Sequence, residues 1–534
     1  MKKIRDIKVL YLVLILGIVI SSCTKFDDVN IDPTRSSDLD PGLQLSNVQL
    51  RFSGDLEVNE KIGLVLTMPM VQQIGGIWLN RNGQFYVYDR NYLSSVWNNT
   101  YNNDIINIVD AVSRTTGNPE KSNLNAICRI MKVYEFARLT DVYGDIPYFE
   151  AGKAYSNGII QPKFDKQEDI YNDFFKELQE AQAQLDASKD AVSSDLFYGG
   201  NIALWKKFAN SLRLRYAMRL VKINPDKAKA EAQAAFDAGV FTSNAELCKM
   251  EHQDVQNTYT DVRGNGVSAA FCQSEVIPRL LNPFIDQLRT TNDPRLQHLV
   301  RHYIDIVNRP FDRIDITDQM RPLVGYSGVP ANEYIWDTWI APVTITLPGG
   351  TAYAAVTNDQ KAQLPNFMIR NNAPFLHQTY AEVAFLLAEA TVRWGETFGG
   401  TKETHYANGV RAAIQQLSLF PGGPSISESE INAFILANNF TPMMSTAQEI
   451  ELINKQLWVA LLLNGSEAYA NWRRTGYPAL VSSTNYDSSV LTTPRRFEYP
   501  IFELEQNATN ASVAVQALGA GGNTWTNRVW WDKL

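Results

Sequence analysis

Apolar residues recur at helical spacing along most of this chain of 534 residues. Leu124, Ile127, Met131 and Tyr134 are separated by three, four and three positions, which places all four side chains on one face of a helix. Similar stripes predict further helices over Ile170–Leu185, Trp205–Leu220, Tyr380–Trp394, His405–Leu417 and Thr446–Leu463. The pattern therefore indicates a protein built mainly of amphipathic helices.

Residue types at the expected helix starts support this interpretation. Asn224 stands before Pro225, and a cap residue followed by a first-turn proline predicts a helix over Asp226–Ala238. Thr446 and Glu449 have the spacing of a capping box, in which each side chain bonds the backbone of the other residue. We therefore expect well-defined helix starts at these two places.

Several of the predicted helices come in pairs about 30–40 residues apart, with small residues where two helices would cross closely. Ala230–Gly239, and Leu386–Gly395 with His405–Ile414, resemble degenerate tetratricopeptide repeats. The predicted fold class is all-α, a tetratricopeptide-like helix-pair scaffold within residues 43–534.

Two regions, residues 69–101 and 301–368, break the helical pattern. Both are rich in glycine and aromatic residues, the first also in asparagine and the second in proline, and the second contains the strand-like run PVTITL. We expect them to form a loop-rich capping subdomain with minor β hairpins. Binding residues tend to lie on such loops because a rigid framework positions them.

The aromatic residues of these two regions are the candidate ligand contacts. A flat aromatic face packs against the C–H groups of a sugar ring, while neighbouring amides and carboxylates bond its hydroxyls. The first region offers Trp78, Arg81, Tyr86, Tyr88 and Trp97, with Asn80 and Asn82 beside them. The second region offers Tyr326, Tyr334, Trp336, Trp339 and Tyr353, with Asn332 and Asp337 beside them. The alternative for each aromatic residue is packing inside its own subdomain.

The N-terminus has the features of an exported precursor. Four basic residues precede the apolar run Val9–Ile20, which leads into Ser21-Ser22-Cys23. The run is shorter than the roughly 20 residues that a membrane-spanning helix needs. Residues 1–22 are the predicted signal peptide, and Cys23 is the predicted site of a covalent diacylglycerol or other acyl lipid. A plain secretory peptide with a chance cysteine is the alternative. Residues 23–42, acidic and proline-containing, read as a flexible tether.

Charge and cysteine content narrow the possible partners. Removing a leader of net charge +3 changes the formal net charge from −8 to −11, which disfavours nucleic acid or an anionic membrane surface as the main partner. Cys128, Cys248 and Cys272 remain once Cys23 is acylated, so one disulfide at most is possible. The absence of a C-x-x-C pair makes a thiolate zinc site improbable.

The sequence contains few signals of catalysis. His298 and His302 have a metal-binding spacing, but the glutamate of an H-E-x-x-H motif is missing, and we interpret both as solvated helix residues. No P-loop and no G-x-S-x-G motif is present. A pair of carboxylates suited to glycoside hydrolysis stays possible on any chain with 57 acidic residues. The prediction is a binding protein without catalytic residues, metal or cofactor.

Several motifs resemble those of the SusD/RagB family of Bacteroidetes outer-membrane lipoproteins, and they are most similar to its SusD-like branch. They occur in the order found in that family and span nearly the whole chain. These motifs are Cys23–Asp28, Arg138–Tyr148, Tyr380–Ala390, Asn464–Pro478, Arg495–Pro500 and Val529–Lys533. The resemblance implies a cell-surface lipoprotein that acts as a lid over a SusC-like TonB-dependent transporter. Such a lid binds a glycan, or a peptide in the RagB branch, and delivers it for import without chemistry. A surface glycoside hydrolase is the more distant alternative.

Within that resemblance, the motif residues suggest structural roles. Gly144 fits a tight turn at a helix end, flanked by aspartates that bond free backbone donors. Trp472, with Arg473 and Arg474, is expected to stack and to pair with carboxylates such as Glu467 or Glu503. Glu382 is expected to pair with an arginine.

Overall fold

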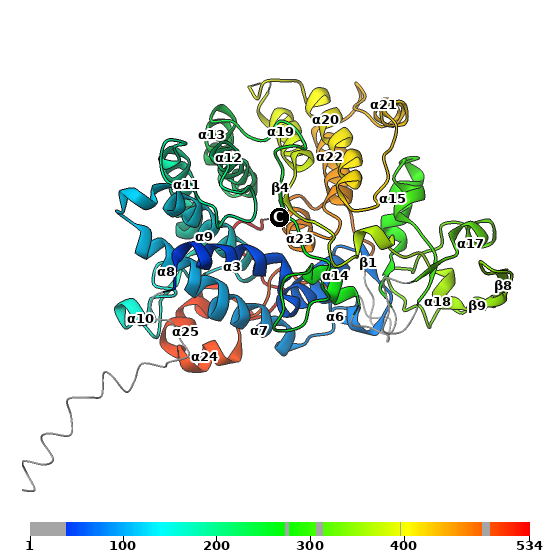
Figure 1. Cartoon of the computed structure of the whole chain (residues 1–534), viewed down its shortest axis with the longest axis horizontal. Coiled ribbons are helices and arrows are strands. Elements are labelled where there is room, and N and C mark those ends of the chain that lie inside the picture. Colours follow the sequence, from blue (N-terminus) through cyan, green and yellow to red (C-terminus); the bar gives the residue numbers. More distant parts are fainter. Residues whose placement is uncertain (1–38, 273–276, 306–312, 396, 483–491, 534) are drawn as a thin grey trace, which may run out of the picture. The chain divides into compact units, whose positions relative to one another are not determined.

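The computed structural model describes residues 39–272, 277–305, 313–395, 397–482 and 492–533 (Figure 1). Cys23, the predicted signal peptide and most of the predicted tether lie outside these residues. The first described helix begins at Pro41, so the last two residues of the segment expected as a tether are helical. In the part of the chain that is described, none of the helices combines the length and apolar character needed to cross a membrane.

Helices form the scaffold, and successive ones pack side by side (Figure 1). In the N-terminal half these are α3 (Pro41–Gly54), α8 (Ile106–Thr115), α9 (Ser122–Tyr143), α11 (Gln167–Gln184), α12 (Ile202–Arg219) and α13 (Pro225–Asp237). In the C-terminal half they are α19 (Tyr380–Trp394), α20 (Lys402–Gln415), α21 (Glu428–Ala437), α22 (Thr446–Ala460), α23 (Gly465–Thr475), α24 (Ile501–Gln506) and α25 (Ala508–Ala517). The all-α helix-pair scaffold is confirmed.

Shorter helices connect these elements and carry the loop-rich part. They are α4 (Leu56–Asn59), α5 (Met68–Met70), α6 (Arg81–Gln84), α7 (Arg90–Asn99), α10 (Ala154–Asn157), α14 (Gly266–Phe271), α15 (Asn282–Thr290), α16 (Leu296–Leu299), α17 (Thr317–Val324) and α18 (Thr357–Gln360). The 3-10 turns are η2 (Trp78–Asn80), η4 (Pro119–Lys121), η6 (Asn366–Met368) and η7 (Gln416–Leu419). Two segments, η1 (Glu60–Thr67) and η3 (Thr100–Ile105), are π-helices.

The strands within the described ranges form only two-stranded antiparallel pairs. The pairs are β1 (Ile74–Gly75) with β5 (Arg279–Leu280), β2 (Ile146–Pro147) with β3 (Phe164–Asp165), β4 (Cys248–Met250) with β10 (Phe375–Gln378), β6 (Tyr303–Ile304) with β7 (Ile314–Asp315), and β8 (Val343–Thr346) with β9 (Ala352–Ala355). In the hairpin β8–β9, Ile345 lies opposite Tyr353. The expected minor hairpins are confirmed, and the run PVTITL supplies β8.

Helix ends follow local side-chain chemistry, with one correction. The side chain of Asn224 caps α13 by accepting the Lys227 N–H, as expected. The capping box of α22 is formed by Ser445 and Gln448, one residue before the predicted pair. The sequence offers two overlapping S/T-x-x-E/Q patterns here, and the structure uses the first. At the end of α9, Gly144 has φ of 88°, which favours glycine and fits the expected tight turn.

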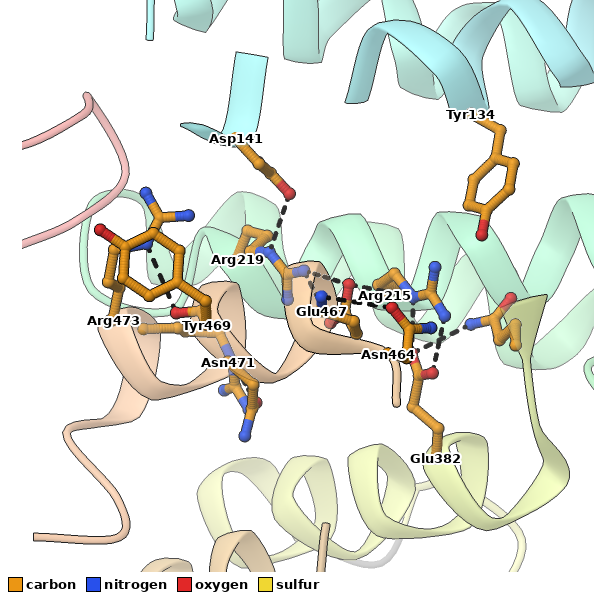
Figure 2. Close-up of polar contacts among 12 residues, drawn as sticks. Tyr134, Asp141, Arg215, Arg219, Glu382, Asn464, Glu467, Tyr469, Asn471 and Arg473 are labelled. Atoms are coloured by element: carbon orange, nitrogen blue, oxygen red, sulfur yellow. Dashed lines mark hydrogen bonds and ion pairs between the residues drawn. The ribbon is translucent and has the colours of Figure 1, made fainter. Parts of the chain in front are cut away.

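Buried ion pairs join the helices of the scaffold (Figure 2). Arg215 of α12 bonds both oxygens of Glu382 at 2.6 Å, and Arg219 bonds both oxygens of Glu467 at 2.6 Å. All four side chains lie in the interior, so each charge depends on its partner. The expected pairing of Glu382 with an arginine is therefore confirmed.

The arginines of the Asn464–Pro478 motif have other partners than expected. Arg474 pairs with Glu389, and Glu467 is held by Arg219. It is Arg495 that lies over the ring of Trp472, at 4.4 Å from the centroid. These contacts join segments that are far apart in the sequence and that only the fold brings together.

A second buried cluster holds more acid than base. Arg51 pairs with Asp55 and with Asp104, and Arg138 bonds Glu135 at 3.1 Å. Three carboxylates therefore share two guanidinium groups. Burial, opposed by Arg138 and reinforced by Asp104, raises the pKa of Glu135 to about 8. The excess negative charge favours one retained proton at neutral pH.

Replacing Glu135 with glutamine is expected to remove a pH-dependent loss of stability. The folded-state pKa lies above the unfolded value of about 4.3, so the folded wild type loses stability as the pH rises from about 4.3 to about 8. At pH 8.5 the Glu135→Gln variant should be more stable by roughly 2–4 kcal/mol. Urea unfolding from pH 5 to 8.5 measures this, with Glu168→Gln on the surface as the control. Parallel profiles for wild type and Glu135→Gln would contradict it.

Candidate binding site

The two irregular regions meet in the folded chain. Gln84 donates its side-chain amide to the carbonyls of Ala331 and Glu333 at 3.0 and 2.9 Å. The backbone N–H of Ile335 donates to the carbonyl of Gly76 at 2.9 Å. A small apolar core of Ile77, Leu281, Val329 and Ile335 lies between the two segments. Residues 74–85 and 329–339 therefore form one surface.

The first of these segments is anchored on the buried π-helix η1. Asn80 donates its side-chain amide to the carbonyl of Leu64 at 2.8 Å, which satisfies an acceptor of the π-helix. Gly83 lies so close to η1 that a Cβ atom there would be 2.3 Å from the carbonyl oxygen of Leu66. This contact requires glycine and fixes the position of the turn that carries Trp78.

This anchoring corrects the expectation for two polar neighbours. Asn80 is fully buried, and Asn82 is buried and donates to the carbonyl of Val87. Both amides stabilise the loop and are not available to a ligand hydroxyl. Asn332 donates to the carbonyl of Ser482, and Asp337 accepts the Tyr334 N–H, so these two also hold backbone in place.

Three exposed tryptophans and one buried tyrosine lie on these two segments, and we call them the aromatic platform: Trp78, Tyr334, Trp336 and Trp339. Trp78, Trp336 and Trp339 have exposed fractions of 62%, 55% and 75%. Tyr334 is buried beneath, with its ring centroid 6.3 Å from that of Trp78 and 4.5 Å from that of Phe85. Exposed tryptophans on neighbouring turns indicate a binding surface, because water disfavours large apolar faces.

Arg81 completes the platform. Its guanidinium carbon lies 3.8 Å from the centroid of the Trp78 ring, in a cation–π contact. The guanidinium thus covers part of the indole and offers hydrogen-bond donors at its edge. The platform thus combines stacking faces with the charge of Arg81. Of the predicted residues, Trp78 lies against Arg81 and near Tyr334, and Trp336 and Trp339 follow Tyr334 on the same segment.

Two predicted contacts lie in the core instead. Trp97 is 3% exposed, and its ring is surrounded by those of Tyr101, Tyr143, Phe164 and Tyr499. Tyr86 is also buried, and its hydroxyl lies 3.0 Å from Thr493 Oγ1. Neither ring has a face for a ligand, so packing explains both residues.

Three further predicted contacts lie apart from the platform in other local environments. Tyr88 donates its hydroxyl to Glu498, and burial with that carboxylate raises the pKa of Tyr88 to about 12. Tyr326 carries Arg321 over its ring at 4.5 Å. Tyr353 donates to Asp359 and packs on a separate apolar cluster. These rings have intramolecular partners and are not part of the platform.

Two residues that support the platform were not among the predicted site residues. Gln84 and Phe85 are buried, and they hold the second segment and the ring of Tyr334. The local sequence around Gln84 and Phe85 carries no signal of their burial, because both lie in a region whose composition predicts a loop.

The histidines and cysteines offer no metal site among the described residues. His302 is fully buried beyond the end of α16, and burial lowers its pKa to about 4, so its interpretation as a solvated helix residue is wrong. Cys128, Cys248 and Cys272 are free thiols, and Cys128 is fully buried in the core.

Comparisons with known proteins agree with this architecture. A family model described as "SusD-like, starch-binding associating with outer membrane" matches residues 35–500. A solved structure described as a chitin-binding protein is 36% identical, with a TM-score of 0.79, and the match covers 93% of this chain and 100% of that one. A SusD-like protein described as Bacteroidetes AC2a is 32% identical over 93% of this chain and 100% of its own, with a TM-score of 0.83.

A chitin-binding SusD homologue from Flavobacterium johnsoniae is 23% identical, with a TM-score of 0.72 over 92% of this chain and 98% of its own, and supports the fold. None of the curated proteins matches the chain. The family model spans most of the chain, and two related structures exceed 30% identity over nearly their full length. The chain therefore belongs to the SusD-like family, whose members bind carbohydrate and do not transform it.

Proposed function

We propose that this protein binds an oligosaccharide on the aromatic platform and delivers it, chemically unchanged, to a SusC-like TonB-dependent transporter. The exposure of Trp78, Trp336 and Trp339 is the observation that carries the proposal. Indole faces bind the C–H faces of pyranose rings, and the Arg81 guanidinium provides donors for hydroxyl or carbonyl oxygens. A linear glycan offers such faces at regular intervals, so several tryptophans engage successive units.

A β-linked glycan with N-acetyl groups is the first ligand class to test. The relative of 36% identity is described as chitin-binding, and the match covers all of that chain. Each N-acetyl group adds a carbonyl acceptor beside the sugar ring, which suits the donors of Arg81. The RagB-type alternative predicts a polar groove with few stacking rings, which differs from the platform described above.

Calorimetry on the purified chain without its leader tests the ligand class. We expect chitohexaose to bind more tightly than maltohexaose and cellohexaose, with no release of shorter products after prolonged incubation. If only maltohexaose binds, the platform remains the proposed site, but the ligand is an α-linked glucan and not an N-acetylated glycan. Co-purified peptides together with no glycan binding would replace the proposal with the peptide-binding alternative, and product release would establish a hydrolase.

We also propose that an acyl lipid on Cys23 anchors the protein in the outer membrane, facing outward. Replacing Cys23 with alanine removes the thiol that comes directly after the small residues Ser21 and Ser22. The variant is expected to lose metabolic fatty-acid labelling and to appear in the medium or the soluble envelope fraction. Labelling that persists in Cys23→Ala would show that the lipid, if any, is attached elsewhere.

A further inference from the structure

A second cleft, separate from the aromatic platform, has a volume of about 350 Å³. It lies between the end of α16, the hairpin β6–β7, the segment around η6 and the loop at residues 422–424. Its walls include Arg301, Tyr303, Asp315, Phe367, Arg370 and Pro424. The volume is sufficient for one or two sugar rings.

One wall of this cleft is cationic on a chain that is acidic as a whole. Arg370 is exposed and forms no ion pair with any residue in the described ranges. Arg301 donates to Asp315 at 2.6 Å through Nη2, and its Nη1 has a long contact of 3.5 Å with the carbonyl of Gln297. Among the described residues that line the cleft, two guanidinium groups therefore accompany one carboxylate, which leaves a net positive charge available to an anionic ligand.

Neutral donors lie beside these cations. Tyr303 Oη accepts the Asn366 N–H at 3.2 Å, and Arg313 lies 4.1 Å from the centre of the Tyr303 ring, so the phenol is held in place. Asn366 Oδ1 accepts from Arg313 at 2.9 Å, which orients the Asn366 amide nitrogen as a donor. Within the described part of the chain, neither the Tyr303 hydroxyl hydrogen nor this amide nitrogen has a hydrogen-bond acceptor.

Apolar side chains also line the cleft. Phe367 packs against Phe420 at a centroid distance of 6.1 Å, and Pro365 and Pro424 line the cleft beside it. An apolar surface and two guanidinium groups in one cleft suit a ligand that has both a C–H face and a carboxylate. A uronic acid ring has this amphiphilic form, whereas glucose lacks the charge.

We propose that this cleft binds an acidic saccharide unit, with its carboxylate on Arg370 and Arg301 and its ring against Phe367. The site is independent of the aromatic platform, and it gives the protein a second specificity for charged glycans. Arg370 is the residue of choice for a test, since among the residues that the structure describes its removal breaks no ion pair.

Calorimetry on the full chain without its leader, at low salt, tests the site with glucuronic acid, glucose and acetate. We expect glucuronic acid to bind at least about tenfold more tightly than glucose and than acetate. Arg370→Ala should weaken glucuronic acid binding about tenfold or more, and Arg370→Lys less, because lysine keeps the charge but loses the bidentate geometry.

Arg289→Ala is the matched control, because Arg289 is an exposed arginine paired with Asp286 outside the cleft. The control should leave glucuronic acid binding unchanged, and Arg370→Ala should leave chitohexaose binding unchanged. Equal binding of glucose and glucuronic acid, or an Arg370→Ala variant with wild-type affinity, would overturn the proposal. Acetate binding as tightly as glucuronic acid would overturn the saccharide assignment and leave a simple carboxylate site. If chitohexaose fails to bind, the proposed ligand of the platform is wrong, and the result for glucuronic acid in the cleft is unaffected.

Discussion

Replacing Arg474 with alanine is expected to lower the free energy of unfolding by about 3–5 kcal/mol. Arg474 Nη1 and Nη2 bond the two oxygens of Glu389 at 2.6 and 2.7 Å, and the two side chains are 1% and 0% exposed. Without Arg474, the Glu389 carboxylate stays in the interior with Arg393 as its remaining cation. The loss is large because an interior charge cannot recover its hydration.

The position of this pair explains why the effect extends beyond one contact. Arg474 lies on α23 and Glu389 on α19, and both bond Asn454 of α22. Three helices of the scaffold therefore meet at one polar centre. Burial opposes ionisation of Glu389, but Arg474 and Arg393 lower its pKa well below the usual value.

The pH dependence of the variant checks the cause. Because the folded-state pKa of Glu389 is depressed, its stabilising contribution is present above the unfolded value of about 4.3 and is lost as the pH falls further. Urea unfolding at pH 7 and pH 4 should show the gap between wild type and Arg474→Ala narrowing at the lower pH. Arg289→Ala, at an exposed pair, should cost less than about 1 kcal/mol. An Arg474→Ala cost as small as that control would show that the interior pair does not stabilise the fold.

The helical scaffold was predictable because its signal is local. The stripe through Leu124, Ile127, Met131 and Tyr134 fixes one buried face, and α9 covers all four positions. The predicted start and end of α19, Tyr380 and Trp394, match the structure. The apolar period of a helix depends only on its own sequence, so it can be recognised without knowing which helices pack against it.

Partners across the fold were not predictable in the same way. Arg474 and Glu389 are 85 residues apart, and Arg219 and Glu467 are 248 apart. The sequence contains many arginines and carboxylates that could pair with one another. Only the packing of α12, α19 and α23 decides which of them meet. For this reason Arg474 pairs with a carboxylate, as expected, but with Glu389 and not with Glu467 or Glu503.

The candidate site was predictable in part, because loop position and burial are different properties. Trp78 and Trp97 lie in the same irregular region. Trp78 is exposed on the turn η2, which packs on η1, whereas Trp97 is buried on the inner face of α7. The composition of the region showed where candidate aromatic residues lie. Which of them are exposed on the platform and which are buried in the core depends on the fold. The approach of the segment 329–339 to the segment 74–85 was also beyond any local signal.

Replacing Trp336 with alanine is expected to weaken binding of the best oligosaccharide roughly tenfold or more, and adding Trp78→Ala should abolish measurable binding. Both indoles are more than half exposed, so truncation removes a stacking face without opening a cavity in the core. The folded fraction and the unfolding midpoint should therefore stay unchanged, unlike those of Arg474→Ala. Trp336→Phe keeps a smaller aromatic face and should lose less affinity.

The matched control for these variants is Tyr259→Ala, because Tyr259 is an aromatic residue of similar exposure outside the platform. It should bind the oligosaccharide as wild type does, since a stacking ligand recognises a placed set of rings and not exposed aromatic surface in general. Affinity gels and calorimetry with the same glycan distinguish the two outcomes. If Trp336→Ala and Trp78→Ala both keep wild-type affinity while a glycan still binds, the platform is not the site, and the ligand must occupy another surface of the scaffold.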